Sequence, residues 1–515
     1  CNNLPSPAEH APIVPSFLNS NAFFRRTTVH PRCNAVPGVP DLHLHAGPAT
    51  IRLPSGASLS ITHNKDTPTL TPYTSQSELN APQDVITCKE KAVAEAVASS
   101  ADSSLPQCIP MNETQFAALS SMFVLGGFLG ALFSGPVSTS YGRLLAMRIT
   151  SLFFVLGSVL EALAGTIPIM SIGRFLSGVG GGASTVIVPL YISEVAPPKE
   201  RGLFGSMTQV TINIGILVTQ TLGFFLSKGS LWRIILAVGA CLGLLQGVGL
   251  FFVPESPAWL AAHKDPQLAV RTLQRIRGPG NSITEETEDW DVSRPAPESE
   301  GLLSDPAISR RDSTNSKASQ KSIPSVGFFA VIKDPLYRPA ITAVIGIMVA
   351  QQLCGINSIM MYSVSLLSGV VSISSSGLTI LISLINLTTT IACAPLADKI
   401  GRKTCLLLSI AGMGSMSCLL AFSLLYQIKL ASAISVLAFV AFFATGLGPV
   451  PFMMASELVG QEAVGATQSW ALAANYVATF LVAQFFPLVN KALNEKFGGK
   501  GWAFFGFAAL AAACF

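Results

Sequence analysis

Hydrophobic residues along the chain gather in long runs that alternate with short polar segments. Each run covers roughly 18 to 25 residues, the length at which an α-helix crosses a hydrocarbon core of about 30 Å. The pattern therefore predicts a protein that crosses a membrane many times. We count eleven runs: Gln115 to Ser138, Arg148 to Gly165, Ile167 to Tyr191, Leu203 to Ser227, Trp232 to Pro254, Pro339 to Leu367, Ser375 to Leu396, Thr404 to Tyr426, Ala431 to Ala455, Ala466 to Val489, and a last one from Gly501 to the final residue.

Composition excludes a soluble globular chain. Of the 515 residues, 50% are hydrophobic and only 12% are charged, which is far from the balance of soluble proteins. The net charge of +4 adds little, because the charges of a membrane protein sort loop by loop. Most Lys and Arg residues fall on alternate loops, and the positive-inside rule places those loops in the cytosol.

Polar segments divide the chain into five parts. Residues 1–78 hold no run of the required length, and we expect them to be disordered or wrongly assembled; residues 79–114 form an outer loop. Two helical bundles follow, over 115–254 and 338–515. A cytosolic linker over 255–337 joins them, and its first part has the apolar spacing of short helices. The rest of the linker has the composition of a disordered segment.

The outer loop carries two features of proteins that face an oxidising compartment. Cys88 and Cys108 both lie there, so a disulfide between them is one alternative and two free thiols are the other. Asn112 begins the sequence Asn-Glu-Thr, an acceptor for N-glycosylation. None of the ten cysteines has metal-ligand spacing, and no metal site is expected.

An internal repeat relates the two bundles. "GPVSTSYGRL" and "APLADKIGRK" both close a hydrophobic run with Gly-Arg, at Gly142 and Gly401. Two bundles with one shared motif, joined by a cytosolic linker, are typical of secondary transporters built from parallel halves. Enzymes embedded in membranes rarely need that symmetry, so we do not expect an enzyme.

"QQLCGINS" places three amides, Gln351, Gln352 and Asn357, inside an apolar run. Such amides can serve as hydrogen bonds that hold helices together, worth on average only about 0.6 kcal/mol each. The alternative is a ligand site. A carboxamide both donates and accepts, so amides can replace the water shell of a sugar hydroxyl without a counter-ion.

From about Ser77 onward the chain resembles the sugar porters of the major facilitator superfamily. The likeness rests on motifs in the order of that family: "GRFLSGVGGGASTVIVPLYISEVAPPKERG", "PESPAWL", "QQLCGINSIMMYS" and "GLGPVPFMMASEL". It implies an all-α membrane protein with the major facilitator fold, two six-helix halves. The first of the twelve helices is then missing and the last is truncated.

The resemblance also implies a sugar site made of amides. The ligands fall on Gln209, Gln351, Gln352, Asn357, Asn386 and Asn475. Phe452 stands where a tryptophan usually stacks on the sugar ring, and Ala444 replaces a common acidic residue. The substrate can therefore differ from glucose.

A second implied set is a cytosolic network of charges that opens and closes in each transport cycle: Arg143, Glu194, Arg201 and Glu255 in the first half, and Asp398, Arg402, Lys403 and Glu457 in the second. The first half of the network departs from the family motif, because Leu144 stands where a second arginine is usual. We therefore expect weaker closure of the network in that half. Arg174 matches an arginine that partners a first-helix aspartate in proton-coupled relatives, and no such aspartate is found.

We thus expect a transporter that moves a hexose or similar sugar by alternating access, facilitative or proton-coupled, with no cofactor. The alternative is a transporter-like sensor that binds sugar without flux. A small sugar and the lipid bilayer are the expected partners, without nucleic acid, and a monomer is expected. The membrane is either the plasma membrane or that of the vacuole. The missing first helix favours a fragmentary or wrongly assembled gene over a genuine eleven-helix protein.

Overall fold

The computed structural model describes residues 50–52, 58–60, 83–88, 106–227, 229–278, 283–287, 290, 328–360, 375–498 and 501–515. The chain separates into two compact units, residues 1–64 and 65–515. The first unit contains strands β1 (Thr50–Arg52) and β2 (Ser58–Ser60), which pair antiparallel. The prediction that residues 1–78 are disordered or wrongly assembled falls mostly outside the described part, which contains only these two strands of that segment. Ile51 and Leu59 are register partners across the pair.

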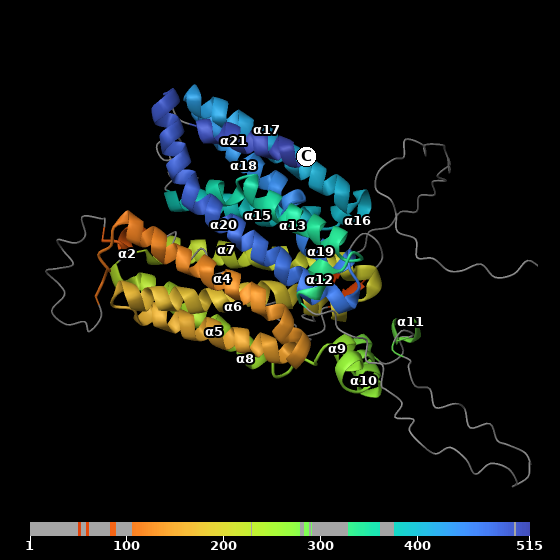
Figure 1. Cartoon of the computed structure of the whole chain (residues 1–515). Helices are drawn as coiled ribbons and strands as arrows, with labels where there is room; N and C mark the ends of the chain where they lie inside the picture. Colours follow the sequence, from red (N-terminus) through yellow and green to blue (C-terminus); the bar gives the residue numbers. More distant parts are fainter. Residues whose placement is uncertain are drawn as a thin grey trace, which may run out of the picture. The chain divides into compact units, whose positions relative to one another are not determined.

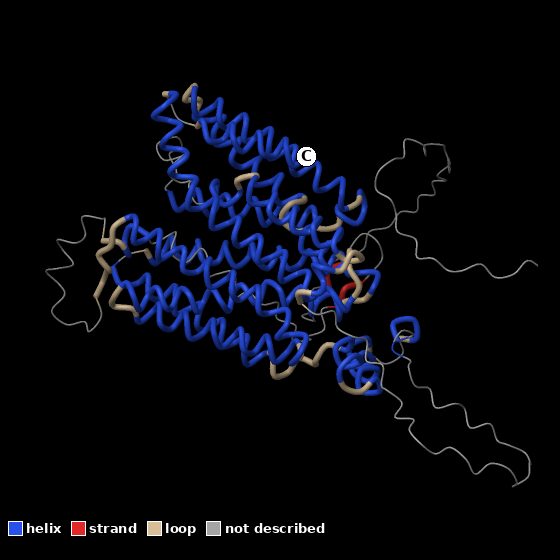
Figure 2. Tube along the Cα trace, viewed as in Figure 1, coloured by secondary structure: helices blue, strands red, loops and turns tan. Residues whose placement is uncertain are grey.

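The second unit is a bundle of long helices (Figures 1 and 2). Its first half contains α4 (Glu113–Tyr141), α5 (Arg143–Leu163), α6 (Ile167–Val195), α7 (Arg201–Leu226) and α8 (Trp232–Gly249). Its second half contains α13 (Arg338–Leu353), α15 (Ser375–Cys393), α17 (Arg402–Leu425), α18 (Lys429–Thr445), α19 (Val450–Glu457), α20 (Gln461–Phe497) and α21 (Trp502–Cys514).

These helices confirm the predicted membrane spans. Within the described residues, nine helices are long and apolar enough to cross a membrane, and two shorter apolar helices cover Gly377–Cys393 and Trp502–Cys514. Each corresponds to one of the eleven hydrophobic runs. Large apolar side chains also stay exposed on their outer faces, such as Leu244 at 60% and Leu245 at 64% on α8. Lipid tails would cover such faces.

Short helices lie between and beside these spans. They are α2 (Gln83–Ile86), α9 (Pro257–His263), α10 (Pro266–Arg277), α11 (Thr284–Thr287), α12 (Ala330–Lys333) and α16 (Leu396–Ile400), with the 3-10 turns Pro198–Glu200 and Gly229–Leu231. Helices α9 and α10 confirm the helical start of the linker. Each begins at a side-chain cap, since Ser256 Oγ accepts from the N–H of Trp259 and Asp265 Oδ1 accepts from that of Gln267, as N-cap residues do.

Glycines with positive φ mark the repeat. Gly142 has φ 97° between α4 and α5, and Gly401 has φ 90° between α16 and α17. A side chain at such a φ is strained, so glycine suits both corners. Each corner turns the chain from one span into the next and places an arginine, Arg143 or Arg402, at the start of the following helix.

The two halves meet along two pairs of helices. α4 packs on α20, and α7 packs on α15, and Figure 1 shows α4 and α20 running side by side. Inside the first half, α6 lies against both α4 and α5. The interface between the two halves is therefore formed by α4 and α7 of the first half and by α15 and α20 of the second.

The end of the linker is fixed to α20. Phe328 stacks on Trp470 with ring centroids 4.9 Å apart, and the Trp470 indole N–H donates to the Phe328 carbonyl. Tyr337 donates its hydroxyl to Glu462 Oε1 at 2.6 Å. This hydrogen bond, together with burial, raises the pKa of Tyr337 to about 12, so the phenol keeps its proton and the bond at neutral pH.

A disulfide closes part of the outer loop on itself. Cys88 and Cys108 are bonded, with Cα atoms 5.6 Å apart. Beside them, Ile86 and Ile109 are buried in a cluster with Trp232 of α8. Asn112 is exposed directly before α4, a placement open to a glycan; its backbone N–H donates to Gln115 Oε1.

Replacing Cys88 with serine is expected to lower the free energy of unfolding by up to about 3 kcal/mol, because a disulfide that closes a loop of this length restricts the unfolded chain. Thermal denaturation of the purified protein in detergent, with and without reductant, measures the change. The matched control is Cys241→Ser, since Cys241 is an exposed free thiol on α8. Equal melting of the two variants would contradict the prediction.

Candidate functional site

Four of the predicted amides form one cluster on α13 and α20. Gln352 Nε2 donates to Asn475 Oδ1 at 3.2 Å, and Asn475 Nδ2 donates to Gln351 Oε1 at 2.8 Å. Asn357 Nδ2 donates to Gln352 Oε1 at 2.6 Å. Gln351 and Gln352 are 6% and 5% exposed. We call these four residues the α13–α20 amide cluster.

A break in the helix shapes this cluster. α13 ends at Leu353, Gly355 has φ 93°, and residues 356–360 are helical again. The break lets Asn357 reach back toward Gln352. Interrupted helices of this kind expose backbone groups at the midplane sites of transporters. Asn357 also lies 3.4 Å from Thr479 Oγ1 of α20.

The remaining two predicted amides lie in a second cluster, which crosses between the halves. Gln209 Nε2 on α7 donates to Asn213 Oδ1 at 3.3 Å. Asn213 Nδ2 then donates to two groups of α15, Thr390 Oγ1 at 2.8 Å and Asn386 Oδ1 at 3.2 Å. All four side chains are buried. We call them the α7–α15 cluster.

The chain between α18 and α19 lies against both clusters. Gln351 Nε2 donates to the carbonyl of Leu447. The next residue, Gly448, is so close to Gln209 that a Cβ there would lie 3.6 Å from Gln209 Cδ. One predicted amide of each cluster, Gln351 and Gln209, thus lies against this short segment. Every polar side chain in the two clusters is uncharged.

Phe452 lies on α19, beside the amides. It packs against an apolar cluster that includes Met348, whose backbone carbonyl accepts from Asn475 Nδ2 at 2.9 Å. Phe452 also lines a pocket of about 300 Å³ between the halves. Phe452 therefore contacts both the pocket and the apolar cluster that includes Met348.

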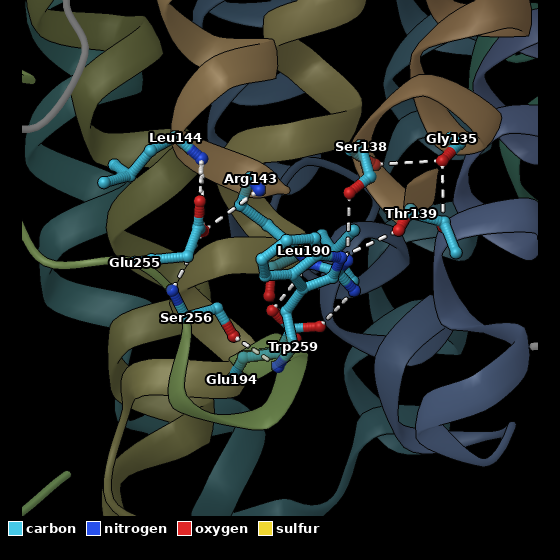
Figure 3. Close-up of polar contacts among 11 residues, drawn as sticks. Gly135, Ser138, Thr139, Arg143, Leu144, Leu190, Glu194, Glu255, Ser256 and Trp259 are labelled. Carbon is cyan, nitrogen blue, oxygen red and sulfur yellow. Dashed lines mark hydrogen bonds and ion pairs between the residues drawn. The ribbon is translucent and has the colours of Figure 1, made fainter. Parts of the chain in front are cut away.

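The charged residues of the predicted cytosolic network form a matching arrangement in each half. In the first half, Arg143 binds Glu194 through two contacts, Nη2 to Oε1 at 2.6 Å and Nε to Oε2 at 2.9 Å. Its Nη1 donates to the carbonyl of Ser138, five residues earlier. Glu255 accepts from the backbone N–H groups of Arg143 and Leu144. Figure 3 shows these contacts.

In the second half, Arg402 repeats the geometry. It binds Glu457 with Nη2 to Oε1 at 2.9 Å and Nε to Oε2 at 3.1 Å, and donates to the carbonyl of Ala397, five residues earlier. It also pairs with Asp398 at 2.7 Å. The first-half pair is the more buried, at 7% and 5% exposure against 28% and 37%. Leucine at position 144 keeps its backbone bond to Glu255, so its side chain is not needed for that contact.

Two predicted members of the network stay outside these contacts. Arg201 and Lys403 are exposed, and no ion pair of either is found within the described residues. Arg201 lines the pocket between the halves together with Glu194 and Glu457. Lys403 follows Arg402 and so points about 100° around the helix from it.

Arg174 has a partner that we did not predict. Its Nη1 lies 3.6 Å from Glu161 Oε2 of α5, and the two side chains are 3% and 0% exposed. Ser177 Oγ donates to Glu161 Oε1 at 2.6 Å, and the guanidinium lies over the ring of Phe123. Glu161 is the single acidic residue in the hydrophobic run from Arg148 to Gly165. An acidic residue inside such a run could have indicated a buried partner of opposite charge.

Comparison with known proteins places these features in a family. The family model described as "Sugar (and other) transporter" matches residues 73–515. A probable metabolite transport protein of Saccharomyces cerevisiae, YBR241C, is 31% identical over 85% of this chain and 86% of its own length. The human solute carrier family 2, facilitated glucose transporter member 4, is 29% identical over 81% of this chain and 79% of its own length.

A solved structure shares the fold. The proton:xylose symporter XylE of E. coli, of the major facilitator superfamily, in its form bound to 6-bromo-6-deoxy-D-glucose superposes with a TM-score of 0.65. The match covers 87% of this chain and 94% of the symporter, at 22% identity. The helices described above therefore have the major facilitator fold.

Proposed function

Because the chain belongs to the sugar transporter family of the major facilitator superfamily, we propose that it carries a hexose or a similar sugar across its membrane by alternating access. It is a multi-pass membrane protein and not an enzyme, since the members of this family are transporters. The observation that carries the proposal is that two clusters of uncharged amides, with members from both halves, lie against the same short segment, Leu447 and Gly448, through Gln351 and Gln209. Such groups suit hydroxyls that both donate and accept.

The charged networks support the same cycle. Each half closes its own corner with a buried or partly buried arginine–glutamate pair, so each half can move as a rigid body. The pocket between them holds Glu194, Arg201 and Glu457 on facing walls. Opening of this pocket would expose the amides to the cytosol, and closing it would shield them from the cytosol.

Uptake of radiolabelled hexose by cells that lack their own hexose carriers tests the proposal. The expected result is saturable uptake that depends on the expressed chain. Sugar binding by the purified protein without any uptake would replace the carrier with a sensor. Absence of both binding and uptake for a panel of hexoses and pentoses would refute a sugar substrate.

We also propose that Glu161 takes up the proton if transport is proton-coupled. Ionisable side chains inside membrane spans are expensive and commonly mark proton relays. Glu161 is fully buried, and its Oε2 has no hydrogen bond among the described residues. The charged groups around it are Arg174 on α6 and Arg233 on α8, which donates to the carbonyl of Ala162. Protonation of Glu161 would remove the negative charge that faces Arg174.

Changing Glu161 to glutamine is expected to abolish accumulation of sugar driven by a pH gradient in proteoliposomes. Exchange of labelled for unlabelled sugar at equal concentrations should persist, because exchange needs no net proton movement. Glu495→Gln is the matched control, since Glu495 is 68% exposed near the end of α20. Gradient-driven accumulation that survives Glu161→Gln would refute the assignment, and a parent protein that never accumulates sugar would make transport facilitative.

A further inference from the structure

The α7–α15 cluster contains one amide, Asn213, that is not among the predicted sugar ligands. Asn213 is 1% exposed and lies one helical turn after Gln209. It is bonded to a side chain of its own half, Gln209, and to two of the other half, Asn386 and Thr390. It is thus the central member of the cluster.

The hydroxyl of Thr390 fixes which way the Asn213 amide points. Thr390 Oγ1 donates its single proton to the backbone carbonyl of Asn386 at 2.7 Å. Its oxygen can then only accept, so the group of Asn213 that meets it at 2.8 Å must be the NH₂ group. An amide orientation is normally chosen from its hydrogen bonds, and the Thr390 hydroxyl, whose proton is directed at Asn386, supports this orientation of Asn213.

The orientation of Asn213 sets the orientation of both predicted ligands. Its second N–H meets Asn386, which must present its carbonyl oxygen and so keeps its NH₂ group for another partner. Its own carbonyl oxygen meets Gln209, which must present NH₂ and so keeps its carbonyl oxygen. The NH₂ group of Asn386 and the carbonyl oxygen of Gln209 therefore remain for a ligand, one group from each half of the protein.

We propose that Asn213 is a positioning residue for substrate specificity: it holds Asn386 as a hydrogen-bond donor and Gln209 as an acceptor toward the same sugar. This inference rests on the proposed function. A hydroxyl that donates to Gln209 and accepts from Asn386 satisfies both groups, whereas a deoxy position leaves two buried amide groups without partners. Discrimination should thus depend on Asn213 even though it need not touch the sugar.

The test is a cycle between protein variants and ligand analogues. Binding of D-glucose and each of its monodeoxy derivatives is measured on the purified full chain in detergent, for the parent and for Asn213→Leu. At one hydroxyl position, removal of the hydroxyl is expected to weaken binding at least about fivefold more in the parent than in Asn213→Leu, a coupling in the range found for directly linked groups. At the other hydroxyl positions, the effects of removing the hydroxyl and of Asn213→Leu on the free energy of binding should be additive.

Further variants keep the test decisive if Asn213→Leu folds poorly. Thr390→Val should reproduce the loss of discrimination at the same hydroxyl, and Thr390→Ser, which keeps the hydroxyl, should restore it. Thr388→Val is the control, because Thr388 is exposed on the same helix. Parent-like discrimination in both Asn213→Leu and Thr390→Val would overturn the inference while sugar binding stands. Failure of the parent to bind any of these sugars would refute glucose-like substrates, and the inference with them.

Discussion

Changing Gln352 to leucine is expected to weaken sugar binding at least about 100-fold, which corresponds to about 2.7 kcal/mol. Gln352 is the link of the α13–α20 amide cluster: it donates to Asn475 and accepts from Asn357. Leucine has no polar atoms, so Asn475 and Asn357, which are partly buried, both lose a partner. A buried polar group without a partner costs about 1–3 kcal/mol, and the ligand contact of Gln352 is lost as well.

Equilibrium binding to the purified protein and uptake in carrier-deficient cells both measure this effect. Gln267→Leu is the matched control, because Gln267 is an exposed amide on the cytosolic helix α10. Size-exclusion chromatography shows whether each variant is folded. If folded Gln352→Leu protein binds sugar as tightly as the parent, the amides of α13 are helix-to-helix hydrogen bonds and not a binding site.

The fold could be predicted from the sequence because its main determinant is local. A membrane span is a run of apolar residues of fixed length, so each of the eleven runs could be recognised without knowledge of its neighbours. The corners at Gly142 and Gly401 were equally visible, because a positive φ at the end of a span favours glycine.

The details of the candidate site depend on which helices lie side by side. Hydrophobic runs and short motifs do not indicate which helices pack together. The Glu161–Arg174 pair joins two different helices, so the position of one residue in the sequence does not predict its contact with the other. Asn213 acquires its importance only because α15 of the other half packs against α7. The resemblance to the family placed Lys403 in the charged network with Arg402, yet one step along a helix turns a side chain about 100° away.

The closeness of α4 and α6 leads to the largest expected loss of stability. A Cβ added at Gly182 of α6 would meet the backbone carbonyl of Gly127 on α4 well inside contact distance. Gly178 has the same relation to the carbonyl of Phe123, and Gly130 to that of Val179. Small residues let membrane helices approach at their backbones. Since a backbone carbonyl cannot rotate away, Gly182→Ala must push the two helices apart.

We expect Gly182→Ala to destabilise the protein by about 3 kcal/mol or more, at the upper end of the range for overpacked sites, and to lower the yield of monodisperse protein. Thermal denaturation in detergent measures it. Gly346→Ala on α13 is the matched control, because nothing lies within 4 Å of a Cβ added there and alanine favours a helix over glycine by up to about 1 kcal/mol. If the two variants melt alike, α4 and α6 do not pack through their backbones, and the first half of the bundle must be held together by its side chains instead.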